Sequence, residues 1–318
     1  MVSAPAHLHA GNIDMHGGLG RLYGTLGFTI SQPRLVAVFE PCPQPRVRGP
    51  GGAARLMEDA LELLRSSYGL PGLCAKVLQS IPRGVGLGAT TTTVLAAATA
   101  YNTLFDAGIG LGDAALLAGR STVSGLGFHG FRLGGALLDG GFPVGCRTCI
   151  PPLIARYELP ASWRFVAVVP SRAVPLVREV KEREDEVLST MPPMDPRKAE
   201  RLSRLLVMKL LPALAEHDLS TLLEALTEFN SRLGAEYWAA AQHGTYCCPL
   251  AEEAAEIMKR HAGGAAQSSW GPTVYTIVPS ASEAARLAEM LRAWLSSRGG
   301  GFLYISPPDN RGTVVRRL

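Results

Sequence analysis

The chain has 318 residues and a formal net charge of +4, with 47% of its residues hydrophobic and 18% charged. This composition excludes intrinsic disorder, and the sequence has no block of like charge long enough for a nucleic-acid-binding tail. Glycine is unevenly distributed, since 26 of the 35 glycines lie in residues 1–150. Glycines cluster where the backbone turns sharply or comes close to a ligand, so a binding site is predicted in the first half.

The first half is predicted to begin with short strands and turns. We expect strands at residues 4–10, 25–30 and 35–40, with a turn at Gln32 and Pro33 between the last two. A helix is then expected, because apolar residues recur on one helical face. These residues are Ala54, Met57, Leu61, Leu64 and Tyr68.

Residues 81–93 read IPRGVGLGATTTT and run into a predicted helix at 92–105. Glycines in such a segment let successive backbone N–H groups converge on an anion, and a helix N-terminus adds partial positive charge. The threonine hydroxyls could meet phosphate oxygens or a metal ion. The segment is neither a P-loop, which needs Gly-Lys-Ser/Thr, nor a dinucleotide fingerprint. The residues alone fit a phosphate site and a plain glycine-rich turn equally well.

The rest of the chain mixes helices and strands in two halves, which indicates an α+β fold. A change of composition near Pro151 and Pro152 places the boundary between an N-terminal domain, 1–155, and a C-terminal domain, 156–318. A solvated charged segment is expected at 178–186 and a linker-like break at 191–196. Further helices are expected at 113–120, 199–215, 219–238 and 251–261 and after a capping box at Ser280, and further strands at 134–138, 165–169, 273–278, 302–305 and 314–317.

An apolar stripe follows the predicted helix at 219–238, and burial in the core is expected for it in preference to a dimer face. The stripe consists of Leu219, Leu222, Leu223, Leu226, Phe229, Leu233 and Tyr237.

Two further polar segments could carry chemistry. One is Ser124-Gly-Leu-Gly127, followed by Asp139-Gly-Gly141. The other is Gln267-Ser-Ser-Trp-Gly-Pro272, a rigid turn that is dense in hydrogen-bonding side chains.

The opening of the chain holds three histidines, and strand alternation puts His7 and His9 on one face. With Asp14 and His16 they could bind a metal, but their spacing matches no standard ligand set. We therefore expect surface or hydrogen-bonded histidines.

Cys146 and Cys149 have the spacing of half a zinc site, and the adjacent Cys247 and Cys248 make a poor second half. Buried or surface thiols are expected, and the state of both pairs stays open. The sequence shows neither a signal peptide nor a run of 18 apolar residues, so we expect a soluble, cytoplasmic protein with no membrane or nucleic-acid partner.

These segments, in this order, resemble the GHMP kinase superfamily. Pro82, Gly86, Leu87 and Gly88 fit its Pro-x-x-x-Gly-Leu-Gly-Ser-Ser phosphate loop, with Ala89-Thr90 in place of the two serines. The resemblance implies a two-layer α+β fold, with a phosphate-binding N-terminal half and a ferredoxin-like C-terminal half. These kinases often carry Ser-Gly-Ile-Asp, whose aspartate is the catalytic base.

This chain has glycine, Gly127, where those kinases have the aspartate. Glycine has no carboxylate to take a proton from an alcohol, so an ATP-dependent small-molecule kinase becomes the second hypothesis.

A narrower family, the beta-ribofuranosylaminobenzene 5'-phosphate synthases, is similar to this chain from end to end. The most specific match is Gln267-Ser-Ser-Trp-Gly-Pro-Thr-Val-Tyr275. The other matching segments are Leu8-His9, Ile13-Asp14, Gly86-Leu-Gly88, Ser124-Gly-Leu-Gly127, Asp139-Gly-Gly141, Leu210-Leu-Pro-Ala-Leu214 and Gln242-His-Gly-Thr-Tyr246. The segment Ala89-Thr-Thr-Thr92 departs from the family's Ser-Gly-Thr-Gln.

That resemblance implies a phosphoribosyltransferase of methanopterin-type cofactor biosynthesis. It joins phosphoribosyl pyrophosphate to 4-aminobenzoate and releases CO2 and pyrophosphate, with Mg2+ as cofactor. The sequence leaves open whether 4-hydroxybenzoate is the acceptor, whether kinase activity persists and whether the chain is a non-catalytic phosphate-ligand-binding paralogue. A homodimer is the family expectation.

The roles that the resemblance implies divide the candidate residues into three groups. Asp14 would stabilise the oxocarbenium ion or transfer a proton, and Arg21 would clamp a phosphate or carboxylate. Phosphate binding is assigned to Arg83, Gly84, Gly86, Leu87, Gly88, Ala89, Thr90 and Thr91, with Thr90 also as the metal ligand. Substrate binding is assigned to His9, Ser124, Gly125, Gln267, Ser268, Ser269 and Trp270.

Overall fold

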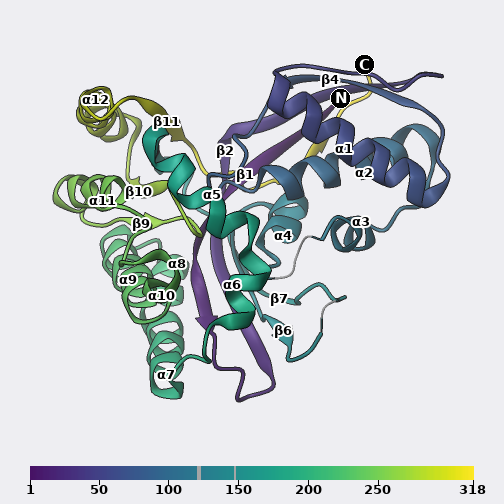
Figure 1. Ribbon diagram of the computed structural model, residues 1–318. Coiled ribbons are helices and arrows are strands. Elements are labelled where there is room, and N and C mark those ends of the chain that lie inside the picture. The colour runs from purple at the N-terminus through teal and green to yellow at the C-terminus, as the bar shows by residue number, and fades with distance from the viewer. Residues whose placement is uncertain (120–122, 147) are drawn as a thin grey trace.

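The computed structural model describes residues 1–119, 123–146 and 148–318, whose strands form two sheets (Figure 1). The first sheet has the order β12-β1-β2-β4-β3, with β5 and β6 paired to β2 and β7 paired to β5. The second sheet has the order β11-β8-β10-β9. The α+β prediction is confirmed.

The strands of the first sheet are β1 (Val2–Asp14), β2 (Arg21–Pro41), β3 (Val47–Arg48), β4 (Leu73–Gln79), β5 (Ala136–Asp139), β6 (Phe142–Pro143), β7 (Leu153–Tyr157) and β12 (Val314–Val315). Those of the second sheet are β8 (Arg164–Pro170), β9 (Ala266–Gln267), β10 (Val274–Val278) and β11 (Gly301–Ser306). The helices of the first half are α1 (Gly51–Tyr68), α2 (Ala89–Phe105), α3 (Leu111–Leu117) and α4 (Leu126–Leu133).

The long hairpin β1–β2 is the central element of the molecule (Figure 1). The prediction of two strands separated by a turn at Gln32 and Pro33 is wrong, because β2 runs unbroken through both residues. Pro5 pairs with Arg34 and Ala6 with Ile30, so residues 31–33 form a bulge in place of a turn. A bulge bends a strand without ending its pairing.

Helix α1 is confirmed, and it buries the middle of the predicted face together with two further residues. Leu56 and Ala60 are buried beside the predicted Met57, Leu61 and Leu64, whereas Tyr68 is 40% exposed. Strand β4 and helix α4 were not predicted from the sequence. Both are short, and neither has the clear alternation or the capping residues that would mark it.

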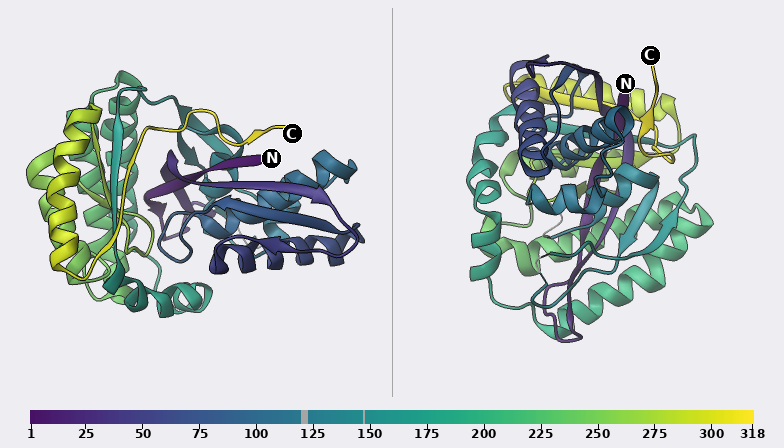
Figure 2. Two further views of the ribbon diagram at one scale, coloured as in Figure 1. Left: turned by 90° about the horizontal axis from the view of Figure 1, so that it is seen from above. Right: turned by 90° about the vertical axis from the view of Figure 1, so that its right-hand side faces the viewer.

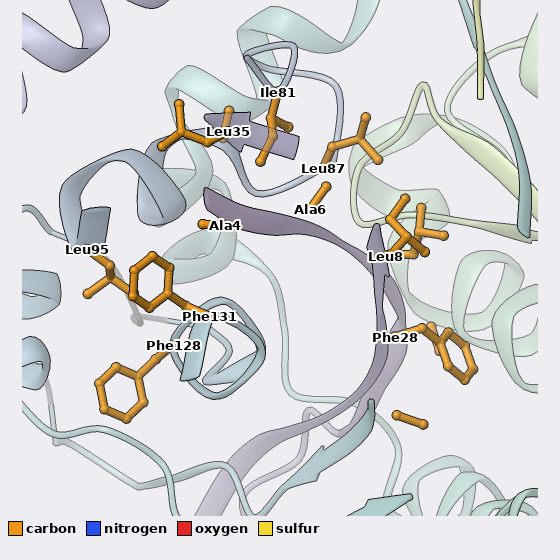
Figure 3. Close-up of a cluster of buried hydrophobic side chains, with 14 of the residues drawn as sticks. Ala4, Ala6, Leu8, Phe28, Leu35, Ile81, Leu87, Leu95, Phe128 and Phe131 are labelled. Atoms are coloured by element: carbon orange, nitrogen blue, oxygen red, sulfur yellow. The ribbon is translucent and has the colours of Figure 1, made fainter. Parts of the chain in front are cut away.

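The core joins the two halves of the chain. Leu8 of β1 and Phe28 of β2 are fully buried, and the Phe28 ring lies 5.5 Å from that of Phe165 in β8 and 6.2 Å from that of Tyr275 in β10. Figure 3 shows this cluster continuing to Ile81 and Leu87, so buried apolar side chains anchor the glycine-rich loop in the core.

The second half carries α5 (Val174–Glu182), α6 (Glu184–Thr190), α7 (Pro196–Leu205), α8 (Leu211–Glu216), α9 (Leu219–Leu233), α10 (Ala239–Gln242), α11 (Pro249–Ala262) and α12 (Ala281–Ser297). Between them lie the 3-10 turn η1 (Ser171–Ala173) and the π turns η2 (Leu206–Leu210) and η3 (Gly234–Trp238). Helices α11 and α12 cover the outer face of the second sheet (Figure 2).

Several predictions about this half can be scored. The capping box is confirmed, because the Ser280 hydroxyl accepts a hydrogen bond from the Glu283 N–H. The apolar stripe of α9 is buried at its centre, including Leu226 and Phe229. The segment predicted to be charged and solvated forms α5 and α6, and part of it faces a cavity.

The chain ends close to its start, since β12 pairs with β1 and the Met1 amino group donates to the Arg316 carbonyl (Figure 2). The expectation of thiols is wrong for Cys146 and Cys149 and is confirmed for Cys247 and Cys248. Disulfides join Cys42 to Cys74 and Cys146 to Cys149, while Cys247 and Cys248 are thiols. Among the described residues, no helix is both long enough and apolar enough to cross a membrane.

Candidate active site

A cavity of about 750 Å³ lies where the two halves meet. The first half contributes the β1 face, the glycine-rich loop and the segment before α4; the second half contributes α5, Glu184, the end of α9, η3 and the turn after β9. Of the predicted site residues, those at the cavity are His9, Arg83, Gly84, Gly86, Leu87, Gly88, Ala89, Thr90, Thr91, Ser124, Gln267, Ser269 and Trp270.

The glycine-rich loop has the backbone expected of an anion site. Gly84, Gly86 and Gly88 have φ values of +76°, +85° and +78°, the left-handed conformation that occurs in nests of backbone N–H groups. Helix α2 begins directly after Gly88, and neither a capping side chain nor an acidic residue occupies its first turn. Its free N–H groups and partial positive charge are therefore available to an anion in the cavity.

Gly88 allows β1 to approach this loop closely. The His7 N–H donates to the Leu87 carbonyl at 3.3 Å, and a Cβ on Gly88 would collide with the His7 imidazole. His7 and the glycine-rich loop therefore lie side by side in the cavity wall.

The turn after β9, in the other half of the chain, holds the glycine-rich loop in place. The buried Ser268 hydroxyl donates to the Gly86 carbonyl at 2.6 Å and accepts from the His9 N–H at 2.9 Å. The Thr273 hydroxyl donates to the carbonyl of Val85. Ser268, predicted to bind substrate, is therefore placed as a clamp within the protein.

Gln267 also has its side chain committed inside the protein. Its oxygen accepts from the Cys247 N–H at 2.7 Å, and its amide nitrogen donates to Gln242 and to the Ser269 carbonyl. Its side chain positions the turn that presents Ser269 and Trp270 to the cavity.

Two tryptophans form an aromatic corner at the second-half side of the cavity. The rings of Trp238 and Trp270 are 4.5 Å apart with an interplanar angle of 64°, and the Trp270 indole N–H donates to Glu184 at 2.7 Å. The π turn η3 places Trp238, and a Cβ on Gly234 would collide with the Thr245 carbonyl. A π turn contains one residue more than an α-helical turn, and the apolar stripe in the sequence did not predict it.

The cavity is lined by cationic and imidazole groups. Arg83 and Arg178 have no ion pair among the described residues. Burial lowers the pKa of His9 to about 3, and repulsion from His7 adds to this, so His9 is neutral at physiological pH. Arg178 was predicted to be solvated and was missed as a site residue.

The segment before α4 is held by a buried carboxylate. Asp139 accepts hydrogen bonds from the N–H groups of Thr25, Gly125 and Gly141, and burial raises its pKa to about 6. Gly125, predicted to bind substrate, is thus bonded to Asp139 and does not line the cavity, whereas Ser124 does.

Gly127 faces the cavity, at the position where GHMP kinases often carry the catalytic aspartate. A Cβ built on it would lie 3.0 Å from Thr91 and 3.1 Å from the His7 ring. The kinase base would therefore project beside these residues, and the cavity wall has no carboxylate at this point.

Asp14 and Arg21, predicted to be catalytic, do not line the cavity. The Asp14 carboxylate accepts from the N–H groups of His16 and Gly17 in the turn after β1. Arg21 donates to the carbonyls of Gly140 and Gly141, at 2.6 Å each. Both side chains have structural partners, and their catalytic roles stay predictions.

The side chains at the cavity could hold Mg2+ only together with ligands from the substrate. The described residues contain no cluster of three or more His, Cys, Asp or Glu side chains that could hold a metal. Thr90 and Thr91 bring hydroxyls to the cavity, so substrate phosphate oxygens and water would have to supply the other ligands, as Mg2+ commonly accepts.

Comparison with known proteins agrees with this geometry. The model of the GHMP kinases N terminal domain matches residues 55–130 and that of the GHMP kinases C terminal matches residues 210–297. Together they cover just over half of the chain. The first matched segment contains the glycine-rich loop and the second contains η3 and the turn after β9.

Curated relatives match over nearly the full length. The beta-ribofuranosylphenol 5'-phosphate synthase of Methanothermobacter thermautotrophicus is 27% identical, covering 99% of this chain and 98% of the relative. The protein of the same name from Archaeoglobus fulgidus is 28% identical and covers 93% and 92%. That of Methanocaldococcus jannaschii is 23% identical and covers 86% and 88%.

Solved structures share the fold. Homoserine kinase from Cytophaga hutchinsonii has a TM-score of 0.62 at 15% identity, covering 98% of this chain and 96% of that one. Mevalonate kinase from L. major has a TM-score of 0.64 at 15% identity, covering 96% and 95%. The chain therefore belongs to the GHMP kinase superfamily and, within it, to the family of enzymes that includes the three archaeal synthases.

Proposed function

We propose that the chain transfers the 5-phosphoribosyl group of phosphoribosyl pyrophosphate to a 4-substituted benzoate, with release of CO2 and pyrophosphate. The observation that carries the proposal is a glycine-rich loop with the backbone conformation of an anion nest, in a cavity whose wall has Gly127 in place of a catalytic carboxylate. The loop suits a diphosphate, and the missing base does not suit phosphoryl transfer to an alcohol. The names of the three archaeal relatives point the same way.

The diphosphate is assigned to the loop of Gly84, Gly86 and Gly88 and to the first turn of α2. Backbone N–H groups and the helix dipole stabilise the charge that develops on pyrophosphate as the ribosyl C–O bond breaks. Arg83 adds a guanidinium at the same wall. Thr90 would hold Mg2+ with the substrate phosphates, and the ion would neutralise further charge on the leaving group.

The benzoate belongs on the side of the cavity that holds Trp238 and Trp270. Its ring carbon C1, which bears the carboxylate, must meet the ribosyl carbon before water does. The two halves of the chain bring the diphosphate and the ring together in one cavity, and the aromatic corner orients the ring.

We propose 4-aminobenzoate as the acceptor in methanopterin-type cofactor biosynthesis. The name shared by the three relatives describes a phenol product, which favours 4-hydroxybenzoate as the second candidate. A homodimer, a cytoplasmic location and the use of Mg2+ are parts of the same proposal.

The test is mass spectrometry of the products formed from phosphoribosyl pyrophosphate, Mg2+ and either 4-aminobenzoate or 4-hydroxybenzoate. We expect a C-linked ribosyl 5-phosphate product that lacks the carboxyl group. An ATP control with the same acceptors and a panel of small alcohols measures ADP. Formation of ADP with no pyrophosphate release would establish the kinase alternative.

A further inference from the structure

Glu184 is a carboxylate in the cavity with no role in the transfer described above. It is the one acidic side chain among the described residues that line the cavity. One oxygen accepts the Trp270 indole N–H at 2.7 Å, and the other has no hydrogen-bond partner among the described residues. An ionised carboxylate has about four acceptor positions, so most of its capacity is open to a ligand.

Glu184 lies beside the two tryptophans that line the cavity. Trp270 is 5% exposed and fixed by Glu184, whereas Trp238 is half-buried and lines the cavity. The Trp238 ring packs edge-to-face with the rings of Trp270 and Tyr237, whose centroids lie 4.5 Å and 4.8 Å away. Its position is therefore fixed before a ligand binds.

We propose, on the basis of the proposed function, that Glu184 and Trp238 form the subsite for the acceptor ring. The ring packs against Trp238, and the Glu184 carboxylate accepts a hydrogen bond from the 4-amino or 4-hydroxyl group. Glu184 thereby selects benzoates that carry an N–H or O–H donor opposite the carboxylate. Both candidate acceptors satisfy this requirement, so the subsite defines their class.

The electron flow gives this hydrogen bond a catalytic role. The π electrons of the ring form a bond from C1 to the ribosyl carbon, while the ribosyl C–O bond breaks and its electron pair leaves on pyrophosphate. The ring becomes cationic, and the charge is shared with the 4-substituent. The bond from C1 to the carboxylate then breaks, its electron pair restores aromaticity, and CO2 departs with no net proton transfer.

The positive charge develops at the atom that donates to Glu184. A carboxylate at that position strengthens its hydrogen bond in the transition state, and the Trp238 face stabilises the cationic ring. A benzoate whose 4-substituent has no hydrogen to donate lacks the hydrogen-bond part of this stabilisation.

The decisive experiment compares matched acceptors. 4-Aminobenzoate is paired with 4-(dimethylamino)benzoate, and 4-hydroxybenzoate with 4-methoxybenzoate, in the wild type and in Glu184→Gln. Glutamine keeps an oxygen for the Trp270 indole but removes the negative charge. We expect kcat/KM for the donor-bearing acceptors to fall on the order of 10²-fold and that for the blocked acceptors to change less than about 3-fold.

Two further variants separate this role from a structural one. Trp270→Phe removes the indole donor and leaves Glu184 charged, so a fall shared equally by both classes of acceptor is expected. Glu186→Gln removes an exposed carboxylate that pairs with Arg183 outside the cavity lining, and wild-type kinetics are expected. An equal fall for both classes in Glu184→Gln, or the same selective pattern in Trp270→Phe, would overturn the proposal.

The wild-type arm separates this inference from the proposed function. Pyrophosphate release with either donor-bearing benzoate supports the proposed function whatever the variants show. If the wild type releases pyrophosphate and Glu184→Gln keeps its selectivity, only the subsite proposal fails. If no benzoate supports release, the proposed function fails and the subsite proposal with it.

Discussion

Ser268 connects the turn after β9 to the glycine-rich loop and to β1, which lie far apart in the sequence. Its replacement therefore tests how the glycine-rich loop is held in place. Its hydroxyl bonds the Gly86 carbonyl and the His9 N–H, and the side chain is fully buried. In Ser268→Ala both backbone groups lose their partner, because the buried methyl group that replaces the hydroxyl can bond neither of them. A buried polar group left unsatisfied costs about 1–3 kcal/mol, so for the two groups we expect a loss of about 2–6 kcal/mol in unfolding free energy.

The functional effect should exceed a general loss of stability. Release of the Gly86 carbonyl frees the loop that is assigned to the diphosphate. Because 1.4 kcal/mol is tenfold in affinity, we expect KM for phosphoribosyl pyrophosphate to rise on the order of tenfold or more, with KM for the benzoate little changed. Urea unfolding and steady-state pyrophosphate release measure the two effects.

The matched control is Ser297→Ala. The Ser297 hydroxyl also donates to a backbone carbonyl, that of Trp294, but on an exposed helix end. A surface substitution of this kind should change stability by less than about 0.5 kcal/mol and leave KM unchanged. If Ser268→Ala behaves like this control, the clamp does not hold the loop as described.

Three further predictions concern the cavity wall and the turn after β1. Gly88→Ala should abolish diphosphate binding in calorimetry, because a Cβ at this position collides with the His7 ring. Gly84→Ala has open space at its Cβ, so it should retain more affinity despite its positive φ. Equal losses of affinity in the two variants would contradict the packing argument. His9 has a folded pKa near 3 against 6.5 unfolded, so acidification from pH 7 to 4 protonates the unfolded chain first and lowers stability by up to about 1.4 kcal/mol per pH unit. His9→Gln should flatten this part of the urea-unfolding profile, and an unchanged slope would contradict a neutral His9. Asp14→Asn keeps one side-chain oxygen to accept the hydrogen bonds of the turn, so stability should stay within about 1 kcal/mol of wild type. A fall in pyrophosphate release on the order of 10²-fold, with folding intact, would support the predicted catalytic role of Asp14. Turnover near that of the wild type would refute that role.

Local features of the chain were predictable from the sequence. The glycine-rich loop before α2 and the capping box at Ser280 depend on residues a few positions apart, and both lie where the sequence indicates. Strand β2 was predicted in two pieces because Gln32 and Pro33 usually mark a turn. Its pairing with β1 on both sides of the bulge outweighs that local preference.

Features of the site that depend on tertiary contacts were not predictable. The turn at Gln267 was singled out correctly, but the sequence cannot show that Ser268 bonds Gly86, 182 positions away. Trp238 reads as the end of an amphipathic helix until the π turn places it in the cavity. Arg178 and Glu184 read as solvated charges, because only the folded chain brings α5 and α6 over the site (Figure 1).

The central claim is a transfer of phosphoribose that expels the benzoate carboxylate. The most direct measurement supplies the wild type with phosphoribosyl pyrophosphate, Mg2+ and 4-aminobenzoate or 4-hydroxybenzoate labelled with ¹³C in the carboxyl group. The account predicts labelled CO2 and pyrophosphate in equal amounts, together with an unlabelled ribosylated product. Pyrophosphate without labelled CO2, or ADP formation from ATP in place of both, would contradict it.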